Sequence, residues 1–419
     1  MPSVTSDLDR LAALDGELVD AARGIKILNY LDWPTDQRSQ FLAAWQSGNP
    51  KLPRVAYKPL DFREQLEALR RISAESDVDH PVGRYIHQTA ASYITAAAML
   101  QGVGSPAFTA CSQELYGRPR DAIGSGNLTN MDAADHFIRV TAEFTGERFE
   151  AETPDVPAES VAERIRDVVG RNFSGDTVNV EVDPGLAAKA AAGARRIRLQ
   201  SLPFSRTDVD QIIQHELFVH SATMRNGKQQ PNLRSMGLGA PRTTRTQEGL
   251  ATLAELVTST MDLGRMRRIA LRIKAIQMGL DGADFLEVFR WFLEMGQDEV
   301  ESYQSSMRVF RGGDVRGRNV FTKDGVYVQG LIFAHIFLRK AMQSGNPQYV
   351  DHLFAGRLTL GDTVALDPFF ASGFIAPARF LPPWVENRAC LAASLSYSVF
   401  ANRINLGDIG LDDFLAHDR

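Results

Sequence analysis

The chain has 419 residues, of which 44% are hydrophobic and 23% are charged, an ordinary balance for a globular protein. Its formal net charge of −5 argues against a nucleic-acid partner, because binding of polyanions depends on concentrated Lys and Arg. The two cysteines, Cys111 and Cys390, exclude a disulfide framework and a cysteine-based zinc cluster. No apolar run approaches the length of a membrane span and no secretory signal is visible, so we expect a cytoplasmic protein without a membrane partner.

The first part of the chain is predicted to be helical. Leucines at helical spacing predict an amphipathic helix over residues 7–23. A turn-rich piece is expected at 115–119, and a segment with Pro154 and Pro157 is predicted to be a linker. We divide the chain into an N-terminal helical annex, residues 1–75, and a main domain, residues 76–419. Further helices are expected over 35–45, 61–72, 81–100, 131–144 and 158–169.

A small sheet is predicted near the middle of the chain. Residues 178–182 alternate apolar and polar side chains and precede Asp-Pro-Gly, a pattern typical of a strand. The alanine-rich run 186–194 is predicted to be a helix, and residues 196–199 a second strand. The fold class is therefore α+β and predominantly helical. The helices expected after the motif region cover 262–279, 284–295, 298–310, 326–342 and 349–354, before a tail of loops and short helices.

The segment His215-Glu216-Leu-Phe-Val-His220 carries two imidazoles and a carboxylate on a helix that is expected to begin near Ser205. Its spacing is one residue longer than in the common peptidase motif His-Glu-x-x-His. At about 100° per residue, a regular α-helix would place the two imidazoles roughly 140° apart, too far round for one metal ion. The motif therefore predicts a π-type turn, or a break in the helix, between His215 and His220.

A second segment, Thr246-Gln-Glu248-Gly-Leu-Ala251, is predicted to begin another helix, from which Glu248 points back at the ion. Two His and one Glu around an open coordination position, with Glu216 beside them, are what a hydrolytic zinc site needs. A third ligand from a downstream helix is the gluzincin arrangement, so we expect a zincin-like core with a distorted motif helix. Glu255, two turns after Glu248, is an alternative third ligand or a partner that orients a His.

Both segments resemble the QEGLA-motif proteins of bacteria, also labelled flavohemoglobin expression-modulating proteins, which are related to the microtubule-associated tyrosine carboxypeptidases. Four other pieces fit the resemblance: Leu115-Tyr-Gly-Arg-Pro119, Asn226-Gly227, Arg311-Gly-Gly313, and Phe321-Thr-Lys-Asp324 with Tyr327 and Gly330. The resemblance implies that His215, His220 and Glu248 bind Zn²⁺ and that Glu216 is the general base. It also implies removal of a C-terminal residue from a peptide or protein substrate.

A carboxypeptidase must bind a terminal carboxylate, for which the planar fork of Arg is best suited. The candidates for substrate binding are Arg245, Arg198, Lys323 and Tyr327, with Tyr327 also considered as an oxyanion donor. A different hypothesis is a regulatory or binding protein with a structural or non-catalytic metal site. Glu216 favours the enzyme, because a structural site has no use for a carboxylate that does not bind the metal. Cleavage at an internal bond, as by an endopeptidase, stays open.

Overall fold

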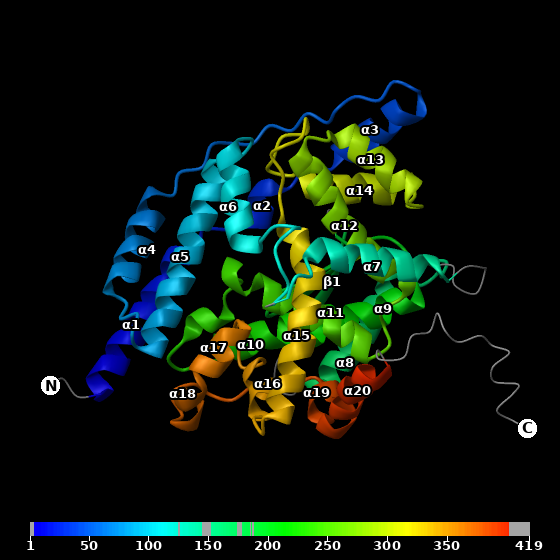
Figure 1. The fold of residues 1–419 in the computed structure, drawn as a ribbon. Coiled ribbons are helices and arrows are strands. Elements are labelled where there is room, and N and C mark those ends of the chain that lie inside the picture. Colours follow the sequence, from blue (N-terminus) through cyan, green and yellow to red (C-terminus); the bar gives the residue numbers. More distant parts are fainter. Residues whose placement is uncertain are drawn as a thin grey trace, which may run out of the picture.

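The computed structural model describes residues 4–124, 126–144, 152–173, 178–184, 186 and 188–401 of the chain. Helices make up most of this structure, and the described ranges contain one small sheet of three strands (Figure 1). The predicted class, α+β with a predominance of helix, is confirmed. None of the described helices is both long enough and apolar enough to cross a membrane.

The N-terminal helices form one side of the molecule (Figure 1). The helices α1 (Val4–Ala22), α4 (Arg63–Glu75) and α5 (Pro81–Gln101) share one apolar core, in which Leu11 and Leu18 of α1 are fully buried. The amphipathic pattern predicted for this region is thereby confirmed. The helix α6 (Pro106–Tyr116) was not predicted from the sequence. Pro106 lies in its first turn, where the missing N–H breaks no hydrogen bond.

The segment between α1 and α4 crosses to the opposite end of the molecule (Figure 1). It carries α2 (Ile27–Leu31) and α3 (Asp36–Gln46), and Phe41 of α3 packs between two phenylalanines of a later helix. The ring centroid of Phe41 lies 5.1 Å from that of Phe285 and 4.9 Å from that of Phe289. The helices that build this end with α3 are α12 (Leu263–Asp281), α13 (Phe285–Glu294) and α14 (Glu299–Phe310).

The sheet has the strand order β1-β3-β2, with β1 parallel and β2 antiparallel to the central strand β3. Its strands are β1 (Asn179–Asp183), β2 (Ala190–Ala192) and β3 (Arg196–Gln200), and the helix α8 (Ala158–Asn172) covers it. The strands predicted at 178–182 and 196–199 are confirmed. The helix predicted over 186–194 is wrong, because residues 190–192 form an edge strand whose pairing with β3 outweighs the helix propensity of three alanines.

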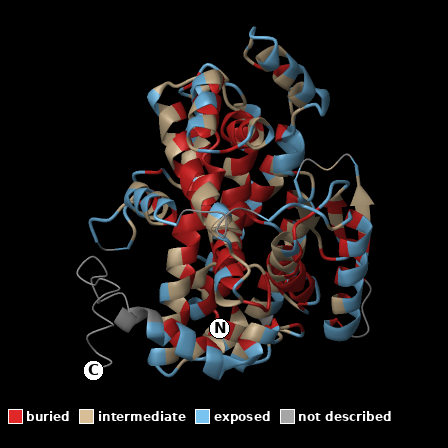
Figure 2. Cartoon of the chain, turned by 90° about the vertical axis from the view of Figure 1, so that its right-hand side faces the viewer, coloured by how far each residue is buried: buried red, intermediate tan, exposed pale blue. Residues whose placement is uncertain are grey.

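Two glycines let the central helices α11 (Thr244–Val257) and α15 (Val326–Gln343) cross in close contact. A Cβ atom added to Gly249 of α11 would lie 2.3 Å from the carbonyl group of Gly330 on α15. Any side chain at either position would therefore force the helices apart. Figure 2 shows that buried residues run through the centre of the molecule, while the outer helices carry the exposed ones.

The other helices predicted from the sequence are present with bounds close to those expected. The tail after α15 is more helical than expected, since its last helix has 14 residues. The remaining helices are α7 (Asn130–Ala142), α16 (Gln348–His352), α17 (Leu360–Ala365), α18 (Asp367–Ala371), α19 (Pro383–Glu386) and α20 (Arg388–Ala401).

Candidate metal centre

A π-helix brings the two histidines of the motif together. Ser205 caps α9 (Arg206–Ile212) through a reciprocal pair of hydrogen bonds with Asp208, and the chain then continues as the π-helix η2 (Ile213–Ser221). In η2 the wider turn places residues five apart on one side. The rings of His215 and His220 consequently lie with their centroids 4.8 Å apart. The predicted π-type turn is confirmed, and the alternative of a broken helix is not needed because α10 (Ala222–Lys228) follows directly.

Glu248 of α11 completes a three-residue cluster with the histidines. Its Oε2 atom lies 3.5 Å from Nε2 of His215 and 3.5 Å from Nε2 of His220. These distances are long for hydrogen bonds. They are close to the separation of about 3.3 Å between the ligand atoms of a tetrahedral zinc ion with bonds of 2.0–2.1 Å. Within the described part of the chain, this is the one group of His, Cys, Asp and Glu residues whose geometry could hold a metal ion.

Glu255 orients His215 from behind the cluster. Its Oε1 atom lies 2.6 Å from Nδ1 of His215, and the carboxylate is fully buried. Burial raises the pKa of Glu255, but Arg265, which donates to it over 3.1 Å, and His215 outweigh this effect and lower the pKa to about 2. Two roles were expected for Glu255, a third metal ligand or a partner that orients a histidine, and the geometry supports the second. The contact with Nδ1 fixes the tautomer of His215 in which Nε2 is free to face the cluster.

Lys323 holds the third member of the cluster. Its Nζ atom donates to Oε1 of Glu248 over 2.8 Å, so that Oε2 faces the histidines. Burial raises the pKa of Glu248, yet Lys323 and both histidines outweigh it and hold the pKa well below the usual range. Lys323 was predicted from the sequence to bind substrate, and that role stays a prediction; the contact that the structure shows for it is the one with Glu248. Tyr327, another predicted substrate residue, lies with its ring centroid 5.3 Å from Nζ of Lys323.

The pKa of His215 reflects how strongly this cluster attracts a cation. Burial lowers the pKa, but the carboxylates of Glu248 and Glu255 outweigh burial and raise it to about 10. A proton and a metal ion compete for the same ring nitrogen. The residues therefore fit a divalent ion, since the donor set combines two imidazoles with an ionised carboxylate and already favours positive charge at this point.

Glu216 is anchored to the edge of the sheet. Its Oε2 atom accepts a hydrogen bond of 3.0 Å from the backbone N–H of Ala192 in β2, and Ser221 donates to the neighbouring carbonyl of Gly193 over 2.8 Å. These contacts fix the motif helix against β2. Sequence reasoning did not find Ala192, because the run that contains it was predicted to be a helix.

The two arginines that were predicted to bind substrate lie in two different parts of the structure. Arg198 forms an ion pair of 3.2 Å with Asp183 along the sheet. Arg245 lies at the start of α11, where its Nη2 atom approaches Gly117, and burial lowers its pKa. Arg357, which no sequence pattern indicated, lies within electrostatic reach of both Glu248 and Glu216. Its position after α16 depends on tertiary packing that a linear motif does not report.

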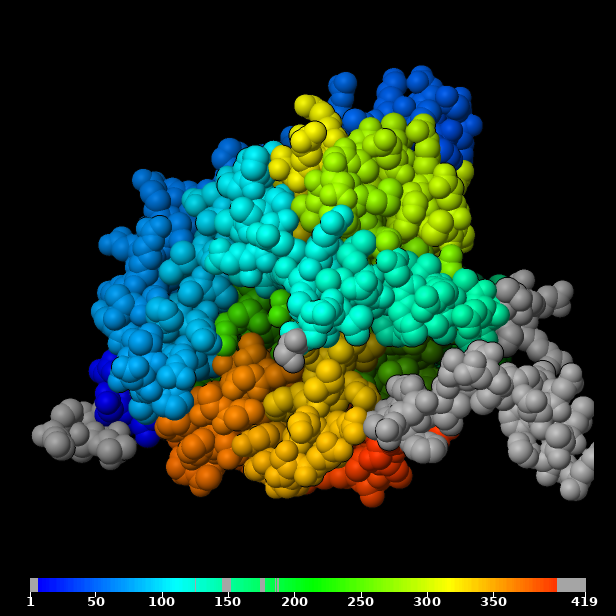
Figure 3. Space-filling view, in the orientation of Figure 1, coloured from blue at the N-terminus to red at the C-terminus, as the bar shows by residue number. Residues whose placement is uncertain are grey.

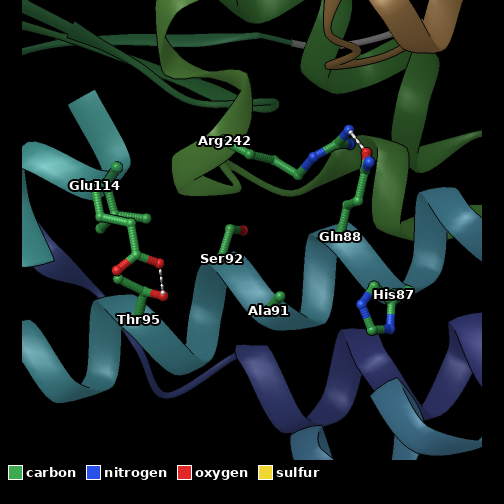
Figure 4. A pocket seen from close by; sticks show the side chains of 8 residues that line it. His87, Gln88, Ala91, Ser92, Thr95, Glu114 and Arg242 are labelled. Atoms are coloured by element: carbon green, nitrogen blue, oxygen red, sulfur yellow. Dashed lines mark hydrogen bonds between the residues drawn. The ribbon is translucent and has the colours of Figure 1, made fainter. Parts of the chain in front are cut away.

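A separate cavity lies between α5, α6 and the short helix η4 (Pro241–Thr243) (Figure 4). Its volume is about 320 Å³, and none of the motif residues lines it. Arg242 in its wall is held by two bonds of 2.8 Å to Asp362 and one of 2.6 Å to Gln88. The space-filling view shows that this face is hollowed between α5 and α6 on one side and α15 and α17 on the other (Figure 3).

The comparison with protein families agrees with the motif. The family model described as microtubule-associated tyrosine carboxypeptidase matches residues 39–403, which include the whole candidate metal centre. The chain belongs to this family. The relation to these carboxypeptidases that the sequence predicted is therefore confirmed. None of the curated proteins compared with the chain matches it.

Proposed function

We propose that this member of the microtubule-associated tyrosine carboxypeptidase family is a zinc-dependent carboxypeptidase that removes the last residue of a peptide or protein. His215, His220 and Glu248 would hold the zinc ion, in a zincin-like core of the gluzincin type. The observation that most supports the proposal is the approach of both imidazoles to one oxygen of Glu248, at 3.5 Å each.

The chemistry divides between the metal and the residues around it. Zinc, when bound, supplies a Lewis acid that lowers the pKa of water and polarises a carbonyl group. Glu216 removes the proton of the attacking water and delivers it to the leaving amine, a role in which one of its oxygens is held by the N–H of Ala192. Glu255 and Lys323 keep His215 and Glu248 in the orientation that binding requires.

The test of this mechanism is Glu216→Gln, with metal content and hydrolysis measured on the same preparation. We expect one equivalent of zinc in both proteins and a loss of turnover of at least about 100-fold in the variant, because a general base typically contributes that much. Glu163→Gln, an exposed position on α8, serves as the matched control. Full hydrolysis by Glu216→Gln would refute its role as the base.

The exopeptidase character has its own test. A peptide that wild-type protein shortens by one residue should resist cleavage once its C-terminus is amidated. Equal cleavage of both peptides would indicate an endopeptidase. Zinc bound without cleavage of any C-terminal peptide would instead support the alternative, a binding protein with a non-catalytic metal site.

A further inference from the structure

Two buried polar side chains join the helix of Glu248 to the end of the π-helix. Thr223 is the second residue of α10, three residues after His220, and Gln247 immediately precedes Glu248 on α11. The Oγ atom of Thr223 lies 2.8 Å from Oε1 of Gln247. Thr223 is fully buried and Gln247 is only 3% exposed. Neither residue belongs to the metal-binding cluster, yet each lies within three residues of one of its members in the sequence.

The helix changes its hydrogen-bonding pattern close to Thr223. The helix α10 begins at Ala222, whose backbone N–H points to the carbonyls of both Leu217 and Val219. A π-helix uses i→i+5 bonds and an α-helix uses i→i+4 bonds, so one pattern must replace the other at this junction. Thr223 supplies an additional donor here, because its hydroxyl lies 2.7 Å from the carbonyl oxygen of Val219. Bonds of this kind alter the path of a helix, and His220 lies within the turn that this one closes.

The number of protons at Thr223 indicates how the amide of Gln247 is used. A hydroxyl group donates one proton, yet Oγ faces three acceptors: Oε1 of Gln247 and the carbonyls of Val219 at 2.7 Å and His220 at 3.3 Å. Among the described residues, the buried Nε2 atom of Gln247 has no hydrogen-bond partner. A half-turn of the amide lets Nε2 donate to Oγ and leaves the hydroxyl proton for Val219. The unpaired atom is then an acceptor instead of a donor, which proteins tolerate more readily.

His220 depends on its backbone for orientation more than His215 does. The ring of His215 is held from behind by Glu255, which lies 2.6 Å from its Nδ1 atom. The Nδ1 atom of His220 is buried and has no hydrogen-bond partner in the described part of the chain. A metal-binding histidine is usually oriented through that second nitrogen. The direction of the His220 ring is therefore set mainly by the helical turn that carries it.

We propose that Gln247 is a positioning residue for His220. Its amide donates to Thr223, whose hydroxyl donates to the carbonyl of Val219. Two hydrogen bonds in series thus connect the helix of Glu248 with the turn of His220, and bonds in series strengthen one another. This inference rests on the metal centre of the proposed carboxypeptidase and adds a residue that acts on that centre only through Thr223.

The first experiment compares cobalt-loaded proteins. Unlike Zn²⁺, whose d shell is filled, Co²⁺ absorbs visible light in bands that depend on the geometry of its ligands. Gln247→Met keeps the length of the side chain and Thr223→Val keeps its shape, while each removes a hydrogen bond. We expect both variants to shift the cobalt bands and to bind zinc about 10-fold more weakly. The double variant should resemble the single ones, because the two residues act through each other.

Thr89→Val is the matched control. Thr89 is buried on α5 and donates over 2.7 Å to the carbonyl of Tyr85, four residues earlier, as Thr223 does to Val219. Loss of such a bond should lower stability in both threonine variants, but only Thr223→Val should change the cobalt spectrum. Thr223→Ser keeps the hydroxyl and should retain the wild-type spectrum. An unchanged spectrum in Gln247→Met, or effects on zinc affinity that add in the double variant, would overturn the proposal; Thr223→Val tests the same bonds if Gln247→Met does not fold.

Hydrogen exchange in metal-free protein separates this inference from the proposed function. Backbone amides of η2 should exchange about 2- to 10-fold faster in Gln247→Met than in wild type, the range that one hydrogen bond contributes. Faster exchange in the variant, combined with a wild-type protein that binds no metal, would refute the metal centre and leave the bonds from Gln247 to the turn of His220 standing. Zinc binding and hydrolysis by wild type, with exchange and cobalt spectrum unchanged in the variant, would refute the role of Gln247 alone.

Discussion

At the scale of single residues, the site depends on contacts behind the proposed ligands. His215, His220 and Glu248 could be predicted from the sequence because a motif places chemically suited residues at a recognisable spacing. The residues that hold these three side chains in place could be predicted only in part. Glu255 was recognised as a candidate through its helical spacing from Glu248, but Lys323 lies 75 residues from the carboxylate that it holds, and spacing carries no information over that distance.

Glu255→Gln tests how much such a support contributes. The amide keeps an oxygen near Nδ1 of His215 but removes the charge that Arg265 and His215 share. We expect zinc affinity to fall by about 10- to 100-fold, the usual effect of removing a partner of a metal-binding histidine. Competition with a coloured chelator measures the affinity, and Glu294→Gln, exposed on α13, provides the control. An unchanged affinity would show that Glu255 does not support the metal site.

At the scale of elements, the site depends on where helices and strands cross. Long periodic helices such as α5 and α15 could be predicted because their own side chains define the buried face. The strand β2 could not be predicted from the sequence, because its conformation depends on hydrogen bonds to β3 and not on the intrinsic propensity of its alanines. That error concealed the contact between Ala192 and Glu216, because a residue in a helix interior would have no free N–H to donate.

The crossing of α11 and α15 gives a prediction at this scale. Gly249→Ala would place a methyl group 2.3 Å from the backbone of Gly330 and push the helices apart, next to Glu248. We expect a loss of about 1–3 kcal/mol in the free energy of unfolding, as for other overpacked sites, together with weaker zinc binding. Denaturant unfolding measures the first effect and chelator competition the second.

Gly170→Ala is the control for this substitution, because nothing lies within 4 Å of a Cβ atom at that exposed position of α8. It should be neutral or stabilising by up to about 1 kcal/mol. If Gly249→Ala behaved like this control, the crossing would be looser than the structure shows.

At the scale of the whole molecule, the N-terminal helix α1 is hydrogen-bonded to the loop that connects the two motif segments. Asp15 of α1 is fully buried and accepts a hydrogen bond of 3.0 Å from the backbone N–H of Ser235, in the short helix η3 (Arg234–Gly237). Burial raises the pKa of Asp15 to about 6, although the bonds from Ser235 oppose this shift. The link is therefore sensitive to pH.

The sign of that effect follows from the direction of the shift. A raised carboxyl pKa means that the folded protein holds the proton more tightly than the unfolded chain, so this contribution to stability is lost as pH rises from about 4 to about 6. The loss amounts to at most about 3 kcal/mol.

Asp15→Asn has no proton to release, so its stability should increase relative to wild type across the same range. Urea unfolding at several pH values measures the difference, with Asp9→Asn, exposed on the same helix, as the control; parallel curves for Asp15→Asn and wild type would contradict the prediction.

The π-helix has a consequence for how the motif could change during evolution. Deleting any one of the three residues between Glu216 and His220 would produce the commoner peptidase motif. Leu217 and Phe218 are buried in the core beneath the sheet, whereas Val219 is buried in the core of α11 and α15. Each deletion would therefore remove one buried side chain from its core, or rotate that side chain towards the other core. The additional residue therefore lets the motif helix contribute buried side chains to both cores next to the proposed metal ligands. We expect single deletions here to be selected against because they impair folding, before any effect on catalysis.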